Sequence, residues 1–127
     1  MAGSMMTDAA LARFQTQLRN EREQLTAQIG QFELSLTEVR ASRGDGVSDD
    51  EHDPEGPTMS TEWSRLSGLE REAADRITAI DRALKRVDAG VYGVCARCGG
   101  RIASARLQAR PDAELCIECA RSAETRH

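Results

Sequence analysis

Residues 95–119 read CARCGGRIASARLQARPDAELCIEC and contain every cysteine of the 127-residue chain. The cysteines form two C-x2-C pairs at a spacing typical of structural zinc sites: Cys95, Cys98, Cys116 and Cys119. Four thiolates leave no vertex of a tetrahedral ion open for water or substrate, so the pattern predicts a structural zinc. After the first pair, we expect Gly99 and Gly100 where the chain folds back under the metal and a side chain would crowd the backbone.

The residues alone leave other uses of these cysteines open. Two disulfides would suit a secreted domain, and a redox thiol pair or a [2Fe-2S] cluster would also use paired cysteines. The first residues, MAGSMMTDAALARF, contain neither the apolar segment nor the cleavage pattern of a signal peptide, so we expect a cytoplasmic chain with reduced thiols and zinc as the cofactor. The leading MAGSM is typical of a cloning remnant, and residues 1–6 are left out of the predicted fold.

Two apolar stripes with spacings of three, four and seven residues precede the cysteines, and each predicts one face of a long helix. Thr7 and Asp8 are expected to cap the first helix, and Gly44 and Gly46 to end it. Thr58 is expected to cap the second helix after Pro57, and Gly90 to close it. The first stripe consists of Leu11, Phe14, Leu18, Leu25, Ile29, Phe32, Leu36 and Val39, and the second of Met59, Trp63, Leu66, Leu69, Ala73, Ile77, Ile80, Leu84 and Val87.

Neither helix, at about 50 Å in length, can bury its stripe alone. Because the connection at residues 44–57 is short, the pattern predicts a mostly α fold in which residues 7–90 form an antiparallel coiled-coil hairpin. Residues 91–127 then form the zinc finger, with a short closing helix from residue 117 to about residue 124. Pairing of the stripes between chains is the alternative, but matched stripes on both sides of one loop favour a monomer.

The charge of the chain is uneven. The net charge is −4, and the helical segments and the zinc-loaded finger are close to neutral. The imbalance lies in GDGVSDDEHDPEGP, residues 44–57, which holds six acidic residues and no Lys or Arg. This segment is either a solvated connector or an acidic functional tip. His52 lies within it, and a lone exposed histidine is seldom a ligand.

Composition and motifs exclude several classes of function. The chain has no run of eighteen apolar residues, so no membrane span is expected. It has no nucleophile–base pair or glycine-rich phosphate loop, so it is not expected to be an enzyme. A pI near 5.2 and interspersed acids argue against DNA binding by the finger's arginines, several of which are expected to pin the finger against the hairpin or a partner: Arg97, Arg101, Arg106, Arg110 and Arg121.

Residues 90–124, GVYGVCARCGGRIASARLQARPDAELCIECARSAE, closely resemble the DksA/TraR proteins, bacterial regulators with a four-cysteine zinc finger. The resemblance rests on the Tyr92-Gly93 pair, the CxxCG knuckle, Ile102, the RLQARP run and the final CIEC. It implies direct binding to RNA polymerase, with the hairpin inserted in the secondary channel so that its tip modulates transcription initiation without reading DNA sequence. A zinc-stapled adaptor for another protein, and a nucleic-acid-binding zinc module, are the alternatives.

The chain departs from the family pattern at the tip, where the family carries D-x-x-D-x-A. Here Asp53 keeps the first acid, whereas Gly56 and Thr58 replace the second acid and the alanine. The resemblance and the local charge together make four acids the expected tip contacts: Asp50, Glu51, Asp53 and Glu55.

The chain also departs from members of the family that respond to guanosine tetraphosphate, which use basic residues. Three of the matching positions hold Glu72, Ala79 and Ala120, which leaves Arg110 from that set. Because phosphates need lysine or arginine, weak or absent binding of this nucleotide is expected.

Overall fold

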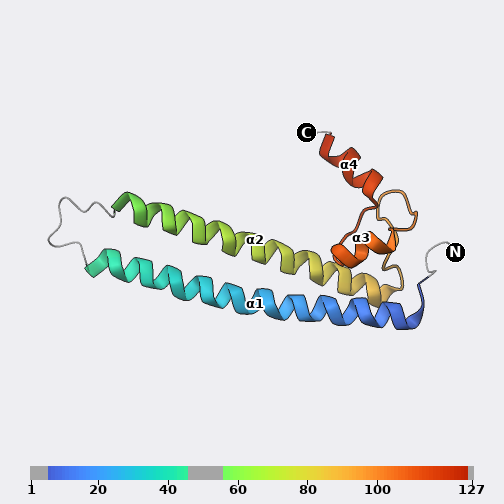
Figure 1. Cartoon of the computed structure of the whole chain (residues 1–127), viewed down its shortest axis with the longest axis horizontal. Coiled ribbons are helices and arrows are strands. Elements are labelled where there is room, and N and C mark those ends of the chain that lie inside the picture. Colours follow the sequence, from blue (N-terminus) through green and yellow to red (C-terminus); the bar gives the residue numbers. More distant parts are fainter. Residues whose placement is uncertain (1–5, 46–55, 126–127) are drawn as a thin grey trace. The chain divides into compact units, whose positions relative to one another are not determined.

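The computed structural model describes residues 6–45 and 56–125, with side chains described for residues 6–42 and 60–125. Along this part of the chain the helices are α1 (Asp8–Asp45), α2 (Gly56–Ala89), α3 (Ser104–Ala109) and α4 (Ile117–Thr125) (Figure 1). The prediction of two long helices followed by a cysteine segment and a short last helix is confirmed. The short helix α3, between the two cysteine pairs, was not predicted.

Helix α1 begins where its cap was predicted. The hydroxyl Oγ1 of Thr7 accepts a hydrogen bond from the backbone N–H of Ala10 at 3.0 Å, which satisfies one of the unpaired N–H groups of the first turn. Asp8 places a negative charge in that turn, where the helix dipole stabilises it. The helix ends at Asp45, between the two glycines that were predicted to end it, Gly44 and Gly46.

Helix α2 begins earlier than predicted. Its first residue is Gly56, so Pro57 lies in the first turn, where a missing N–H costs no intrahelical hydrogen bond. Thr58 is therefore inside the helix, and its predicted role as the cap is wrong. The predicted end is confirmed: Gly90 has a φ of 78°, and the N–H of Val91 bonds the carbonyl of Arg86 at 3.0 Å, as in a Schellman cap.

The chain packs as two compact units. The middle unit is Glu23–Arg76, in which the second half of α1 and the first half of α2 run side by side in opposite directions (Figure 1). Leu66 and Ala73 are buried in it, and the predicted stripe residues Leu25, Phe32 and Leu69 are partly buried. The stripe of each helix therefore faces the other helix, as the heptad spacing predicts.

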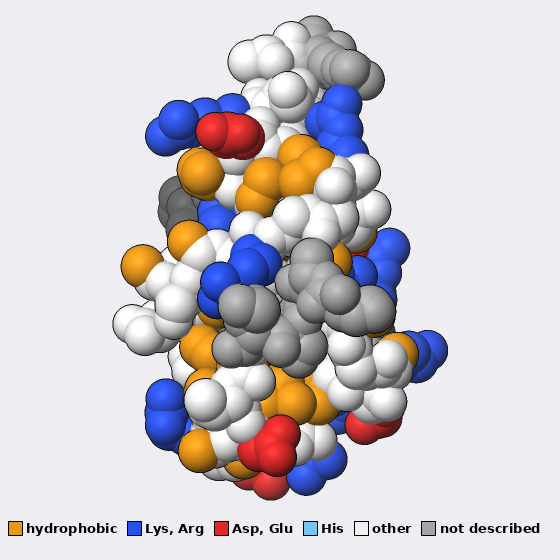
Figure 2. Space-filling model, turned by 90° about the vertical axis from the view of Figure 1, so that its right-hand side faces the viewer, with side chains coloured by type: hydrophobic (Ala, Val, Ile, Leu, Met, Phe, Trp, Pro, Cys, Tyr) orange, Lys and Arg blue, Asp and Glu red, His pale blue; other side chains and the backbone are white. Residues whose placement is uncertain are grey.

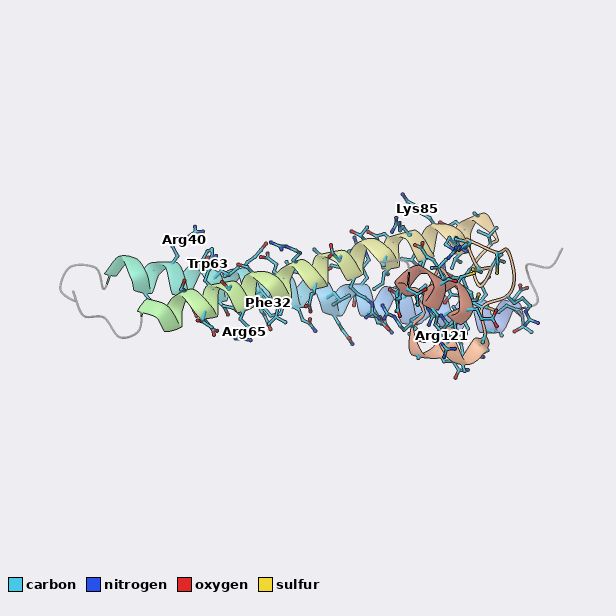
Figure 3. The ribbon with its side chains drawn as sticks, turned by 90° about the horizontal axis from the view of Figure 1, so that it is seen from above. Phe32, Arg40, Trp63, Arg65, Lys85 and Arg121 are labelled. Carbon is cyan, nitrogen blue, oxygen red and sulfur yellow. The ribbon has the colours of Figure 1, made fainter. Side chains whose placement is uncertain are left out.

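Trp63 is part of this stripe and is partly buried. The guanidinium carbon of Arg40, on α1, lies 5.3 Å from the centre of its ring, on α2 (Figure 3). A cation at this distance from an indole face adds a cation–π attraction to the apolar packing. Trp63 thus joins the two helices rather than standing free.

The finger unit contains the described parts of Met1–Arg22 and Ile77–His127. It holds most of the buried apolar side chains of the described residues, contributed by both long helices and by the finger, among them Phe14, Leu18, Ile80, Ala83, Tyr92, Ile102 and Leu107. The rings of Phe14 and Tyr92 lie 5.7 Å apart at an interplanar angle of 44°, a favourable tilted arrangement. The finger therefore shares one core with the start of α1 and the end of α2.

Polar contacts between the finger and the helices come from the helices. Arg86 donates to the carbonyls of Val94 and Val91, and Arg82 lies 3.7 Å from the carboxylate of Glu114. The finger's own arginines bond within the finger instead: Arg106 Nε donates to Leu115 O at 2.8 Å. Arg97 contacts Cys119 O at 3.5 Å, and Arg110 lies 3.9 Å from Asp112. Among the described contacts these three arginines bond within the finger and do not pin it to the hairpin, and a contact of the finger's arginines with a partner stays a prediction.

Tyr92 joins the start of the finger to the segment that follows α3. Its buried hydroxyl donates a 2.8 Å hydrogen bond to the carbonyl oxygen of Pro111. Burial, and then the negative charges of Asp112 and Glu21, raise the pKa of Tyr92, so the phenol keeps the proton that it donates. The hydroxyl thus satisfies a carbonyl in the core.

Replacing Tyr92 with phenylalanine is expected to lower the free energy of unfolding by about 1–2 kcal/mol, because the Pro111 carbonyl loses its buried donor. Urea unfolding followed by circular dichroism measures the change. Thr37→Ala is the matched control, since it removes an exposed hydroxyl that donates to Glu33 O at 2.9 Å and should change stability little. An unfolding midpoint of Tyr92→Phe equal to that of the control would contradict this role.

Candidate metal centre

The first cysteine pair lies in a tight turn. The N–H of Cys95 bonds the carbonyl of Gly100 at 2.7 Å, and the N–H of Gly99 bonds the carbonyl of Cys95 at 3.0 Å. Gly99 has a φ of 77°, and a Cβ added to it would meet nothing within 4 Å. The prediction that crowding requires glycine at this position is therefore wrong. The positive φ requires it, because L side chains rarely adopt that conformation.

The second cysteine pair lies at the start of α4. The N–H of Ala120 bonds the carbonyl of Cys116 at 2.9 Å, so Cys119 lies on the first turn of the helix. The segment before it is held by the bond from Arg106 to Leu115 O and by a 2.8 Å bond from the N–H of Ala96 to Glu114 O. The latter bond joins the turn of the first pair, in which Ala96 lies, to the segment that precedes Cys116.

The four predicted cysteines meet in one cluster, with all their sulfur atoms within 4.8 Å of one another. The sulfur atoms of Cys98 and Cys116 are 3.9 Å apart. A tetrahedral zinc with Zn–S bonds of about 2.3 Å places its sulfur ligands about 3.8 Å apart, so the cluster fits that ion. A disulfide needs sulfur atoms about 2.05 Å apart, and the cysteines are free thiols here.

The ionisation of the four thiols also favours a bound cation. Burial opposes ionisation of Cys95, but N–H groups, among them those of Cys98 and Arg97 at 3.5 and 3.4 Å, lower its pKa to about 6. Hydrogen bonding to Cys116, followed by burial, raises the pKa of Cys119 to about 12. Four thiolates this close together repel one another unless a divalent ion lies among them.

The predicted tip residues are not part of this centre. Asp50, Glu51, Asp53 and Glu55 lie outside the described residues, as does His52. The structure therefore brings together the four predicted metal ligands and leaves the tip contacts as predictions.

Several residues around the centre have roles that the spacing of the cysteines does not indicate. Leu107 is 1% exposed, Pro111 accepts the hydrogen bond of Tyr92, and Arg106 holds the loop that leads to Cys116. All of them belong to the RLQARP run or to the aromatic-glycine pair noted in the sequence. The sequence motifs therefore contained these residues, but their contacts became visible only in the folded structure.

A long helical hairpin followed by a four-cysteine metal centre defines a class of small helical proteins with a structural zinc finger. Residues 90–124 match the prokaryotic dksA/traR C4-type zinc finger. The RNA polymerase-binding transcription factor DksA of Escherichia coli K12 is 34% identical over 122 residues, which cover 95% of this chain and 76% of the relative. The chain belongs to the DksA/TraR family, and its cofactor is zinc.

Two further proteins are similar to this chain. DksA of Haemophilus influenzae is 38% identical over 77 residues, covering 58% of this chain and 52% of the relative. The solved structure of transcription factor DksA2 from Pseudomonas aeruginosa superposes with a TM-score of 0.78 at 26% identity, covering 96% of this chain and 88% of that one. These relatives are named as transcription factors rather than enzymes. Within the described residues, no helix is long and apolar enough to cross a membrane.

Proposed function

We propose that this chain binds RNA polymerase directly and regulates transcription initiation without being an enzyme. The observation that carries the proposal is the extent of the match to DksA, a protein named for binding RNA polymerase, which reaches 95% of the chain and so includes the long helices as well as the finger. A shared zinc finger alone would support a common fold for the last quarter of the chain. A match along both helices supports a common use of the hairpin.

In this proposal the zinc is structural. Cys95, Cys98, Cys116 and Cys119 each give one thiolate, which fills every vertex and leaves no position for a substrate. The finger in turn packs on the hairpin through Tyr92 and Phe14. Zinc therefore maintains the surface that the finger unit presents to the polymerase.

The hairpin is proposed to reach into the secondary channel of the polymerase. A helix of 34 or 38 residues rises about 1.5 Å per residue, which makes a rod of about 50 Å. The acids at its tip suit a magnesium-dependent centre lined by basic groups. We assign the tip contacts to Asp50, Glu51, Asp53 and Glu55.

Two further features of the proposal concern nucleic acid and nucleotide. On the face drawn in Figure 2, the described Lys and Arg side chains are scattered among hydrophobic and acidic ones, which supports a protein partner over a DNA backbone. For guanosine tetraphosphate, the exposed Glu72 would repel phosphate, and Arg110 is already close to Asp112 at 3.9 Å. Both observations support weak or absent nucleotide binding.

Asp53→Asn is expected to reduce the effect of the protein on transcription severalfold while leaving its folding unchanged, because the change removes one acidic charge from the predicted tip. The test is multi-round transcription with purified RNA polymerase on a promoter that forms short-lived open complexes. Glu23→Gln, which removes an exposed charge from α1, is the control for net charge. If both variants act like the wild type, Asp53 takes no part in the mechanism.

A further inference from the structure

The finger unit contains a cavity that the metal centre and the proposed tip do not use. It has a volume of about 220 Å³ and lies among the first turns of α1, the Tyr92-Gly93 pair and α3. One part of its lining is apolar and comes from the buried core: Phe14, Tyr92, Ile102 and Leu107. Met6 and Ala10 add to this apolar lining, and five polar side chains also line the cavity, so it offers both apolar and polar surface to a ligand: Thr7, Arg13, Arg101, Ser104 and Gln108.

The polar part of the lining is cationic. Arg13 on α1 and Arg101 in the finger both line the cavity, and both are exposed. No hydrogen bond or ion pair among the described residues engages either guanidinium, in contrast to Arg82, Arg86 and Arg106. Two arginines from different segments that line one cavity and are not neutralised by a described acid are suited to bind a phosphate or a carboxylate.

Neighbouring groups add to the attraction for an anion. The cavity is also lined by Thr7 at the start of α1, a helix of 38 residues whose positive end lies there. Ser104 and Gln108 on α3 add a hydroxyl and an amide that can donate hydrogen bonds. Among the described residues, no acidic side chain lines the cavity.

We propose that this cavity binds a small organic anion, with its phosphate or carboxylate group on Arg13 and Arg101 and its apolar part against Phe14 and Tyr92. Ligand pockets for drug-sized molecules are about 300–1,000 Å³, so a cavity of this volume suits a phosphate monoester or carboxylate with a single ring or a short chain. The positions matched above to nucleotide binding, among them Ala79, Arg110 and Ala120, do not line it.

The site has a consequence for the finger as a whole. The ligand would contact α1 through Arg13 and the finger through Arg101 and Tyr92, so it would join two segments of the finger unit that are far apart in the sequence. Because a ligand that binds only the folded state stabilises it, saturation should raise the melting temperature of the zinc-loaded protein.

The test is a titration of the zinc-loaded full chain, labelled with ¹⁵N, with phenyl phosphate. We expect saturable shifts of the backbone amide signals of Gly93, Ile102 and Ser104, and a binding constant that weakens as salt increases. Arg13→Gln and Arg101→Gln should each weaken binding about tenfold or more, since each removes charged hydrogen bonds. Arg71→Gln, an exposed change on α2 of the middle unit, should bind like the wild type.

Two further ligands, benzoate and phenol, separate the contributions of the anionic group and of the ring to the affinity. Benzoate in place of phenyl phosphate tells whether the site prefers a carboxylate, and phenol tests the apolar surface alone. Equal binding of phenol and phenyl phosphate, or unchanged affinity in both arginine variants, would overturn the proposal. Because the titration contains no polymerase, its outcome is independent of the proposed function in transcription.

Discussion

Replacing Cys116 with serine is expected to release the zinc and unfold the finger. A structural zinc contributes on the order of 10 kcal/mol to the folding of a small module, which exceeds what the few buried side chains of the finger supply. Serine has no thiolate to give, so three sulfur ligands and their mutual repulsion remain. The helices should persist in part, because the middle unit has its own buried residues, Leu66 and Ala73.

Two measurements report the outcome: the zinc content per chain, and hydrogen exchange of the finger amides. The amides of Ala96 and Ile102, which bond to Glu114 O and Gly93 O at 2.8 Å, should lose their protection. Ser122→Ala, an exposed change on α4, should keep both the zinc and the protection. A Cys116→Ser variant with full zinc and protected amides would show that the cluster is not a four-thiolate structural site.

Replacing Leu18 with alanine is expected to lower the free energy of unfolding by about 2–5 kcal/mol, the range for a large-to-small change in a packed core. Leu18 on α1 is 0% exposed and belongs to the core that the helices share with the finger. Its loss leaves a cavity in this core that the rigid helices cannot fully close. Urea unfolding monitored by helical circular dichroism gives the change.

Leu34 provides the matched control for this prediction. It lies on the same helix and is 67% exposed, so Leu34→Ala removes the same atoms without creating a buried cavity. Leu34→Ala should change the free energy of unfolding by no more than about 0.5 kcal/mol, because alanine is at least as good a helix former as leucine. Equal effects of the two substitutions would mean that α1 does not pack through the face that contains Leu18.

The sequence predicted the two long helices because their apolar residues repeat at helical spacing over many turns, so a single irregular position does not change the result. The start of α2 was predicted two residues too late, because Thr58 satisfies the rule for a cap and Pro57 the rule for a first turn, and only the fold decides between them. Helix α3 was missed because six residues carry too little periodicity. Ala83 was also missed, since a small side chain gives a weak signal even when it is fully buried.

The metal centre was predicted in full because ligand type and spacing are properties of the sequence itself. The surroundings of the centre were not, since the bond from Tyr92 to Pro111 and the contacts of Arg82 and Arg86 join residues by tertiary packing. The reason for glycine at position 99 was also wrong, because backbone dihedral angles are not visible in a sequence. Residues 46–55, which hold the predicted tip contacts, lie outside the described residues.

Direct binding to RNA polymerase can be measured with purified components. The zinc-loaded full chain is applied with purified bacterial core RNA polymerase to a gel-filtration column, with the DksA of Escherichia coli K12 as the positive control. We expect the chain to elute with the polymerase in a one-to-one complex, and the zinc-free Cys116→Ser variant to bind more weakly. If a folded, zinc-loaded chain elutes alone while the control binds, the chain does not bind the polymerase directly.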